Sequence, residues 1–179
     1  MNASSLYRIG GIASIVSAAL YILALAFSIA GLPGMVAPPY IASSALSIIT
    51  IGILTMTLLP RNRILPILAF LLVGGATVWL MLHDLTDLSA SWWPVTMTYG
   101  VGLLFYGWLQ YTGDARTLGI LALAAGAMSV ILGIAMLANM SLTVFGLLDL
   151  GLAIPLAIWM ILLGWGWLRA QGTTKPGSA

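Results

Sequence analysis

The sequence predicts an all-α integral membrane protein, a single domain built as a bundle of about six transmembrane helices. Composition is the first reason. Hydrophobic residues make up 61% of the 179 residues and charged residues 6%, whereas soluble domains average about 45–50% and about 25%. The second reason is length, because six apolar runs approach the roughly 20 residues that a helix needs to cross a bilayer.

Short breaks of turn-forming residues separate the six runs and fix their order. The breaks contain GLPG followed by Pro38-Pro39, then PRNR, HDLTDLSAS, TGDAR and ANMS. Glycine, proline, asparagine and aspartate favour turns, each through its own backbone or side-chain geometry. The predicted helices span residues 7–30, 39–59, 64–82, 94–111, 117–137 and 143–168, and residues 170–179 are expected to form a flexible cytoplasmic tail.

The first and last runs could be read in more than one way. The first carries a basic residue, Arg8, but its apolar stretch is longer than the core of a signal peptide, so we expect it to be retained as a helix. The last is longer than a bilayer requires, and it is expected to tilt or to end in an interfacial turn near Trp165 and Trp167. Most aromatic residues fall near the predicted interfaces. Trp159, near the middle of the last run, does not.

Basic residues indicate which side of the membrane each end faces. With a cytoplasmic N-terminus and an even number of helices, every Lys and Arg lies on the inner side, as the positive-inside rule requires. The inverted topology would place all of them outside. Both termini are therefore predicted to be cytoplasmic. The basic residues are Arg8, Arg61, Arg63, Arg116, Arg169 and Lys175.

Two local patterns bear on helix packing. RIGGI, RILPI and RTLGI begin at Arg8, Arg63 and Arg116, about one helical hairpin apart. They indicate either three repeated hairpins in parallel orientation or simply cytoplasmic arginines followed by lipid-facing runs. Small residues also share faces, which predicts close helix approach. These faces are Gly11–Ser14–Ser17–Ala18 and Gly119–Ala122–Gly126.

Asp149 is the most informative polar residue because it lies inside the sixth run. An Asp at mid-membrane depth costs about 2.5–3.5 kcal/mol on insertion scales, so it should face the bundle interior or a wet cavity. Pro155 cannot donate to the carbonyl of Gly151, and this local break would let water and backbone groups gather near the carboxyl. Asp149 is therefore either a proton-, cation- or ligand-binding group or a neutral acid hydrogen-bonded for helix packing.

A second polar group, His83, Asp84 and Asp87, ends the third run. If the helix extends through them, His83 and Asp87 share a face at i,i+4 spacing, as do Asp84 and Asp87 at i,i+3. The group could bind a divalent ion or relay protons near neutral pH, or it could be an ordinary polar helix end. Metal sites usually need three or four protein ligands, and these three side chains need not meet at one ion. We therefore leave the metal unknown. The remaining acid, Asp114, is expected to be a solvated turn residue beside Arg116.

Several functional classes lack support in the sequence. Lys and Arg are scattered, which argues against nucleic acid as a partner. The absence of cysteine removes disulfides and thiolate metal sites, and one histidine cannot form a bis-histidine haem. No GxSxG, HExxH or phosphate-binding loop is present. We therefore assign no catalytic residue, disfavour an enzyme, and leave the cofactor unknown.

The opening RIGGIASIVSAALYILALAF and the closing LGLAIPLAIWMILLGWGWLR resemble the small, largely uncharacterised multi-pass membrane proteins of bacterial genomes. This resemblance covers the first and last helices. It implies the cytoplasmic (inner) membrane of a bacterium and supplies no activity. The size and helix count are also similar to those of the substrate-binding subunits of energy-coupling-factor vitamin transporters, although a lid-like first loop is missing.

Three functional hypotheses follow. The leading one is a protein that binds or transports a small molecule or ion through an outward-facing pocket, with Asp149 as the buried group and His83, Asp84 and Asp87 at the mouth. The first alternative is a structural subunit or assembly factor that packs on other membrane subunits or on copies of itself. The second is a membrane-embedded enzyme for a lipid or isoprenoid substrate. The lipid bilayer is the partner common to all three.

Overall fold

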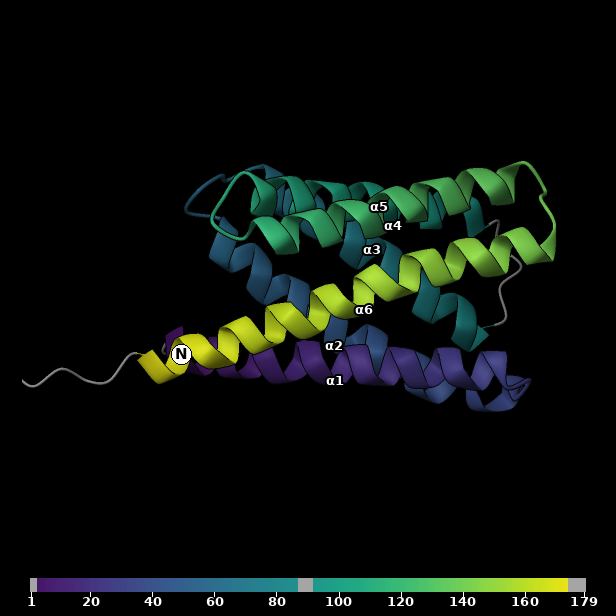
Figure 1. Ribbon diagram of the computed structural model, residues 1–179, viewed down its shortest axis with the longest axis horizontal. Helices are drawn as coiled ribbons and strands as arrows, with labels where there is room; N and C mark the ends of the chain where they lie inside the picture. The colour runs from purple at the N-terminus through teal and green to yellow at the C-terminus, as the bar shows by residue number, and fades with distance from the viewer. Residues whose placement is uncertain (1–2, 87–91, 174–179) are drawn as a thin grey trace, which may run out of the picture. The chain divides into compact units, whose positions relative to one another are not determined.

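The computed structural model describes residues 3–86 and 92–173, with side chains placed for residues 4–82, 92–141 and 143–170. Over this part the chain is all-helical, with six α-helices, one short 3-10 helix and no strand (Figure 1). The predicted fold class is thereby confirmed. The elements are α1 (Ala3–Ile29), η1 (Pro33–Met35), α2 (Ala37–Leu58), α3 (Leu65–Thr86), α4 (Trp92–Tyr111), α5 (Arg116–Leu137) and α6 (Leu142–Thr173).

Helix boundaries follow the predicted runs closely, with differences of two or more residues at five helix ends. α1 begins at Ala3, four residues before the predicted start, and α4 begins at Trp92, two residues before it. α2 begins at Ala37, so Pro38 and Pro39 occupy its first turn, where a missing backbone N–H leaves no hydrogen bond unmade. α3 continues to Thr86 and therefore includes His83 and Asp84 in its backbone. α6 continues to Thr173, five residues beyond the predicted end. α6 also continues through Pro155. The local break expected at this proline therefore does not end the helix.

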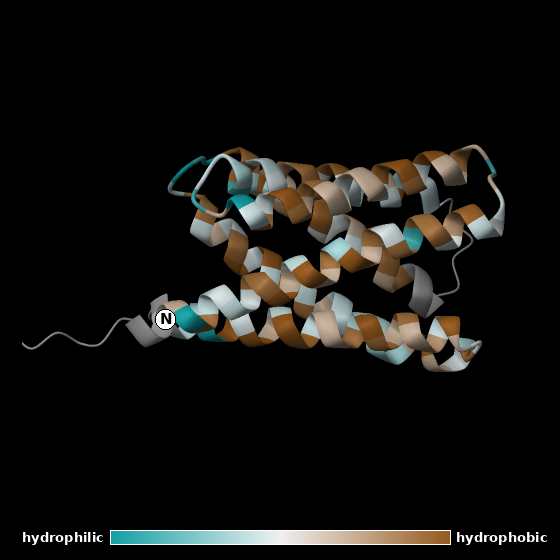
Figure 2. Cartoon of the chain, viewed as in Figure 1, coloured by the Kyte–Doolittle hydropathy of each residue, from teal (hydrophilic) through white to brown (hydrophobic). Residues whose placement is uncertain are grey.

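Five of the described helices are long and apolar enough to cross a membrane, and α4 is not among them. Threonine, tyrosine, tryptophan and Gln110 lower the hydropathy of α4. Polar side chains at membrane depth are tolerated where protein covers them. This holds for Tyr106 and Gln110, which are both buried. In Figure 2 the hydrophobic colour dominates the helices, and most of the strongly hydrophilic residues lie in loops and at helix ends.

The helices form two compact units. Unit 1 comprises Met1–Leu54 and Met160–Ala179, and unit 2 comprises Thr55–Trp159. Unit 1 thus holds α1, most of α2 and the C-terminal part of α6. Unit 2 holds the end of α2, the whole of α3, α4 and α5, and the N-terminal part of α6.

In unit 1, α1 and α6 touch backbone to backbone. A Cβ added to Gly11 would lie 2.9 Å from the Gly164 carbonyl oxygen, and one added to Gly164 would lie 2.6 Å from the Gly11 carbonyl oxygen. Ser14 Oγ donates to the Met160 carbonyl at 2.6 Å. The predicted small-residue face of the first helix is therefore a close helix contact, where small side chains let two backbones approach.

In unit 2, α4 packs closely against both α3 and α5. A Cβ added to Gly100 would lie 2.7 Å from the Gly126 carbonyl oxygen on α5, and one added to Gly126 would lie 2.8 Å from the Gly100 carbonyl oxygen. A Cβ added to Gly102 would lie 2.6 Å from Val73 of α3. Small residues again mark the seams. The least hydrophobic helix thus has close neighbours on two sides.

Within each unit the basic residues that the structure describes gather at one end. In unit 1 the rings of Tyr7 and Trp167 lie 6.4 Å apart, which brings the neighbouring Arg8 and Arg169 to the same end. In unit 2 the ion pair between Arg61 and Asp114 joins the α2–α3 loop to the α4–α5 loop. Both arrangements agree with the predicted layout. The assignment of these ends to the cytoplasm stays a prediction.

Candidate functional site

Asp149 lies in the first turns of α6, within unit 2. It is half-buried. Leu152, Ala153 and Leu156 follow at helical spacings of three, four and seven residues, which place them on the same face, and all three are buried. The carboxyl group therefore lies on the packed face of α6, about one turn before the first fully buried residues of that face.

The residues just before Asp149 on α6 make few contacts within the described part of the chain. Leu147 is 66% exposed, and a Cβ added to Gly146 would meet no atom of the described residues within 4 Å. One turn further on the packing closes, because Gly151 contacts Met128 of α5. Asp149 thus sits at the border between an open and a covered stretch of the helix.

No described residue forms a hydrogen bond or an ion pair with the Asp149 carboxyl. Most other buried polar side chains in the described part of the chain form hydrogen bonds with protein atoms. A carboxyl without a protein partner must take up a proton, bind water or bind another ligand, because leaving it bare in low-dielectric surroundings is costly.

The other predicted site residues give less information. His83 and Asp84 lie in the last turns of α3, but their side chains fall outside the described residues, and Asp87 falls outside them altogether. Their convergence with Asp149 stays a prediction. Among the described residues no group of three or more His, Cys, Asp or Glu side chains could hold a metal ion.

Sequence reasoning missed a buried polar network on α4. Trp159 Nε1 donates to Gln110 Oε1 at 2.8 Å, and the hydroxyl groups of Tyr106 and Thr55 lie 2.6 Å apart. All four side chains are buried. Tyr106 and Gln110 are one turn apart, so a single face of α4 is tied to α2 and to α6 by hydrogen bonds. The position of Trp159 away from the predicted interfaces was the available signal.

Unit 1 has its own buried polar contact between α1 and α2. Ser17 Oγ donates to the Ser43 carbonyl at 2.8 Å, and Ser43 Oγ donates to the Ser17 carbonyl at 2.9 Å. The two hydroxyl oxygens are 3.1 Å apart. The pair is reciprocal and fully internal, so it serves packing.

Asp114 is exposed, as predicted, and it has a partner that the sequence did not indicate. It forms an ion pair with Arg61 of the α2–α3 loop. Arg116 lies over the Tyr111 ring at 5.0 Å and donates to the Tyr111 hydroxyl at 3.2 Å. The loop charges are therefore arranged by contacts between loops as well as by sequence proximity.

Comparisons with known proteins add no family to this description. No protein-family model, curated protein or solved structure matches the chain. The function is therefore inferred from the residues of the site.

Proposed function

We propose that this protein binds or transports a small ion or small molecule within the membrane and that the Asp149 carboxyl is its binding group. The ligand chemistry that suits a lone carboxylate is a proton or a small cation. One observation carries the proposal: Asp149 is half-buried on the packed face of α6 and has no hydrogen-bonding or ionic partner among the described residues.

The comparison with other buried polar groups favours binding over packing. The serine pair of unit 1 and the Gln110–Trp159 pair of unit 2 are satisfied by protein atoms. A carboxyl retained only for packing would be expected to have such a partner, since an intramembrane ionisable group is expensive. Asp149 has none among the described residues.

The wider setting of the proposal comes from the sequence. We place the protein in the cytoplasmic membrane of a bacterium, on the resemblance of its first and last helices. In this arrangement Asp149 lies in the outer half of the bilayer, with His83, Asp84 and Asp87 at the entrance from the outside.

A carbodiimide labelling experiment tests the proposal. Dicyclohexylcarbodiimide adds to protonated carboxyl groups in apolar surroundings, and mass spectrometry locates the adduct. In the wild-type protein in liposomes we expect labelling of Asp149 that falls with rising pH and with added Na⁺ or K⁺, because deprotonation and cation binding remove the reactive form. Asp149→Asn should abolish the adduct. Asp114→Asn, which removes an exposed loop carboxyl, should leave it unchanged.

Flux measurements separate binding from a purely structural role. In proteoliposomes that contain a pH-sensitive dye, the wild type should pass protons or exchange them for a cation, and Asp149→Asn should not. Labelling that ignores both pH and cations, together with equal flux in the two proteins, would overturn the proposal. A fixed partner that co-purifies with the wild type but not with Asp149→Asn would then identify a structural subunit.

A further inference from the structure

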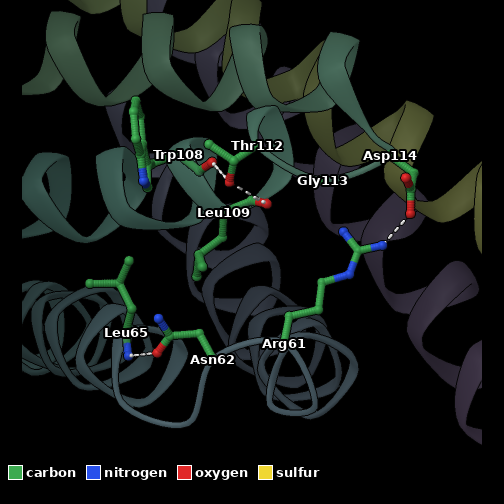
Figure 3. A pocket seen from close by; sticks show the side chains of 8 residues that line it. All are labelled: Arg61, Asn62, Leu65, Trp108, Leu109, Thr112, Gly113 and Asp114. Atoms are coloured by element: carbon green, nitrogen blue, oxygen red, sulfur yellow. Dashed lines mark hydrogen bonds and ion pairs between the residues drawn. The ribbon is translucent and has the colours of Figure 1, made fainter.

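A second candidate site lies at the loop end of unit 2, independent of Asp149. It is a pocket of about 380 Å³ formed where the α2–α3 loop meets the end of α4 and the α4–α5 loop (Figure 3). Pockets that bind small ligands start near this size. The polar lining comes from Arg61, Asn62, Trp108, Thr112 and Asp114, and leucines from α3 and α4 supply an apolar wall.

One side of the pocket offers hydrogen-bond donors. Asn62 Oδ1 accepts from the backbone N–H groups of Ile64 and Leu65 at 3.0 and 2.9 Å, which fixes the amide at the start of α3. Its Nδ2 donates to no described residue, nor does the indole N–H of Trp108, a side chain that is 56% exposed. Figure 3 shows the Asn62 and Trp108 side chains on one side of the pocket. Donors without acceptors suit an anionic group.

The other side carries one positive and one negative charge. The Arg61 guanidinium pairs with the Asp114 carboxylate through a single nitrogen and a single oxygen. Arg61 therefore keeps further N–H donors, and the second oxygen of Asp114, a side chain that is 93% exposed, stays accessible. A Cβ at Gly113 would overlap the Arg61 guanidinium in its present position, so the guanidinium packs directly against the Gly113 backbone.

We propose that this pocket binds the headgroup of a phospholipid that carries both a phosphate and a primary amine, as in phosphatidylethanolamine. The phosphate accepts hydrogen bonds from Arg61, Asn62 and the Trp108 indole, with the guanidinium giving charge-assisted bonds. The ammonium group donates to Asp114, near the C-terminal end of α4, where the helix dipole favours a positive charge.

Charge balance selects this lipid over an anionic one. The two formal charges that line the pocket cancel, which matches a zwitterion. A headgroup that is only anionic would offer no donor to the second oxygen of Asp114 and would be repelled by the carboxylate. Trp108 suits the place because indole rings concentrate at the membrane interface. The alternative, that the Arg61–Asp114 pair merely fastens two loops, is weaker, since exposed ion pairs add little stability.

Native mass spectrometry of the full chain tests the proposal. The protein would be released from nanodiscs that contain phosphatidylcholine with equal small amounts of phosphatidylethanolamine and phosphatidylglycerol. We expect the wild type to retain phosphatidylethanolamine about tenfold over phosphatidylglycerol, which corresponds to about 1.4 kcal/mol. Asp114→Asn should lose that preference. Arg61→Gln should lose retention of both lipids.

Matched controls and competitors make the result decisive. Arg63→Gln removes an exposed arginine from the same loop that does not line the pocket, so it should behave as the wild type. Asp149→Asn should also retain the lipid, which keeps this test separate from the proposed function. Glycerophosphoethanolamine should compete for the pocket and inorganic phosphate should not. Equal retention of the two lipids, a preference that survives Asp114→Asn, or competition by phosphate alone would overturn the proposal.

Discussion

Ser17 in unit 1 and Asp149 in unit 2 are both polar side chains on apolar helices, yet their surroundings differ. The Ser17 hydroxyl is fully buried and exchanges hydrogen bonds with Ser43 on the neighbouring helix. The Asp149 carboxyl is half-buried and has no partner among the described residues. In a bilayer a polar group must be satisfied by protein, by water or by a ligand. A polar group satisfied by protein serves packing, and one that is not is open to a ligand.

The largest effect on stability is expected for Gly164→Ala, which tests the packing of α1 against α6 in unit 1. The added Cβ would lie 2.6 Å from the Gly11 carbonyl oxygen, so α1 and α6 would have to separate. Overpacking of this kind costs about 1–3 kcal/mol. Thermal unfolding in detergent, followed by circular dichroism, would measure the loss.

Gly166→Ala is the matched control on the same helix, because a Cβ at Gly166 would meet no atom within 4 Å among the residues that the structure describes. Replacing glycine by alanine in an open helical position should stabilise the helix by about 0.5–1 kcal/mol. Equal effects of the two substitutions would mean that α1 and α6 are not in backbone contact.

The next test concerns the buried pair of unit 2. Gln110→Leu removes the acceptor of the Trp159 indole N–H and leaves that donor buried without a partner. The expected cost is about 1–3 kcal/mol of unfolding free energy, because the unpaired group keeps its desolvation penalty. Trp159→Phe in the same background removes the donor as well, so the double variant should recover part of the loss. Strictly additive effects in this cycle would show that the two side chains are not coupled.

The same residues show how far the sequence alone could go. The helices were predictable because each is a long apolar run bounded by proline, glycine or asparagine, as with α5, expected at 117–137 and observed at Arg116–Leu137. The small-residue seam at Gly11 and Ser14 was also predictable, since small residues at helical spacing have few other uses. These are local patterns, and hydropathy and spacing report them directly.

Contacts between distant segments were not predictable in this way. Gln110 and Trp159 are separated by 49 residues, and nothing in either run tells which helices are neighbours. Asp114 was expected to be a solvated turn residue, and its ion pair with Arg61 of another loop was not predicted. The pocket that we propose for a lipid headgroup is lined by both residues, so only the arrangement of the two loops reveals it. Asp149 was identifiable from its position in an apolar run, whereas its lack of a described partner required the structure.

The smallest effects on stability form the sharpest comparison. Ser17→Ala removes hydrogen bonds that the protein supplies to itself, and intramembrane hydrogen bonds of this kind average about 0.6 kcal/mol. Asp149→Asn removes no contact with a described residue, so its unfolding free energy should change by less than about 0.5 kcal/mol, as is usual away from structural features. Ser28→Ala, an exposed serine on the same helix as Ser17, supplies the baseline. If Asp149→Asn destabilised the protein more than Ser17→Ala, the carboxyl would have a structural partner, and its role would be packing. A change no larger than that of Ser28→Ala, combined with lost carbodiimide labelling, would instead separate binding from stability at a single residue.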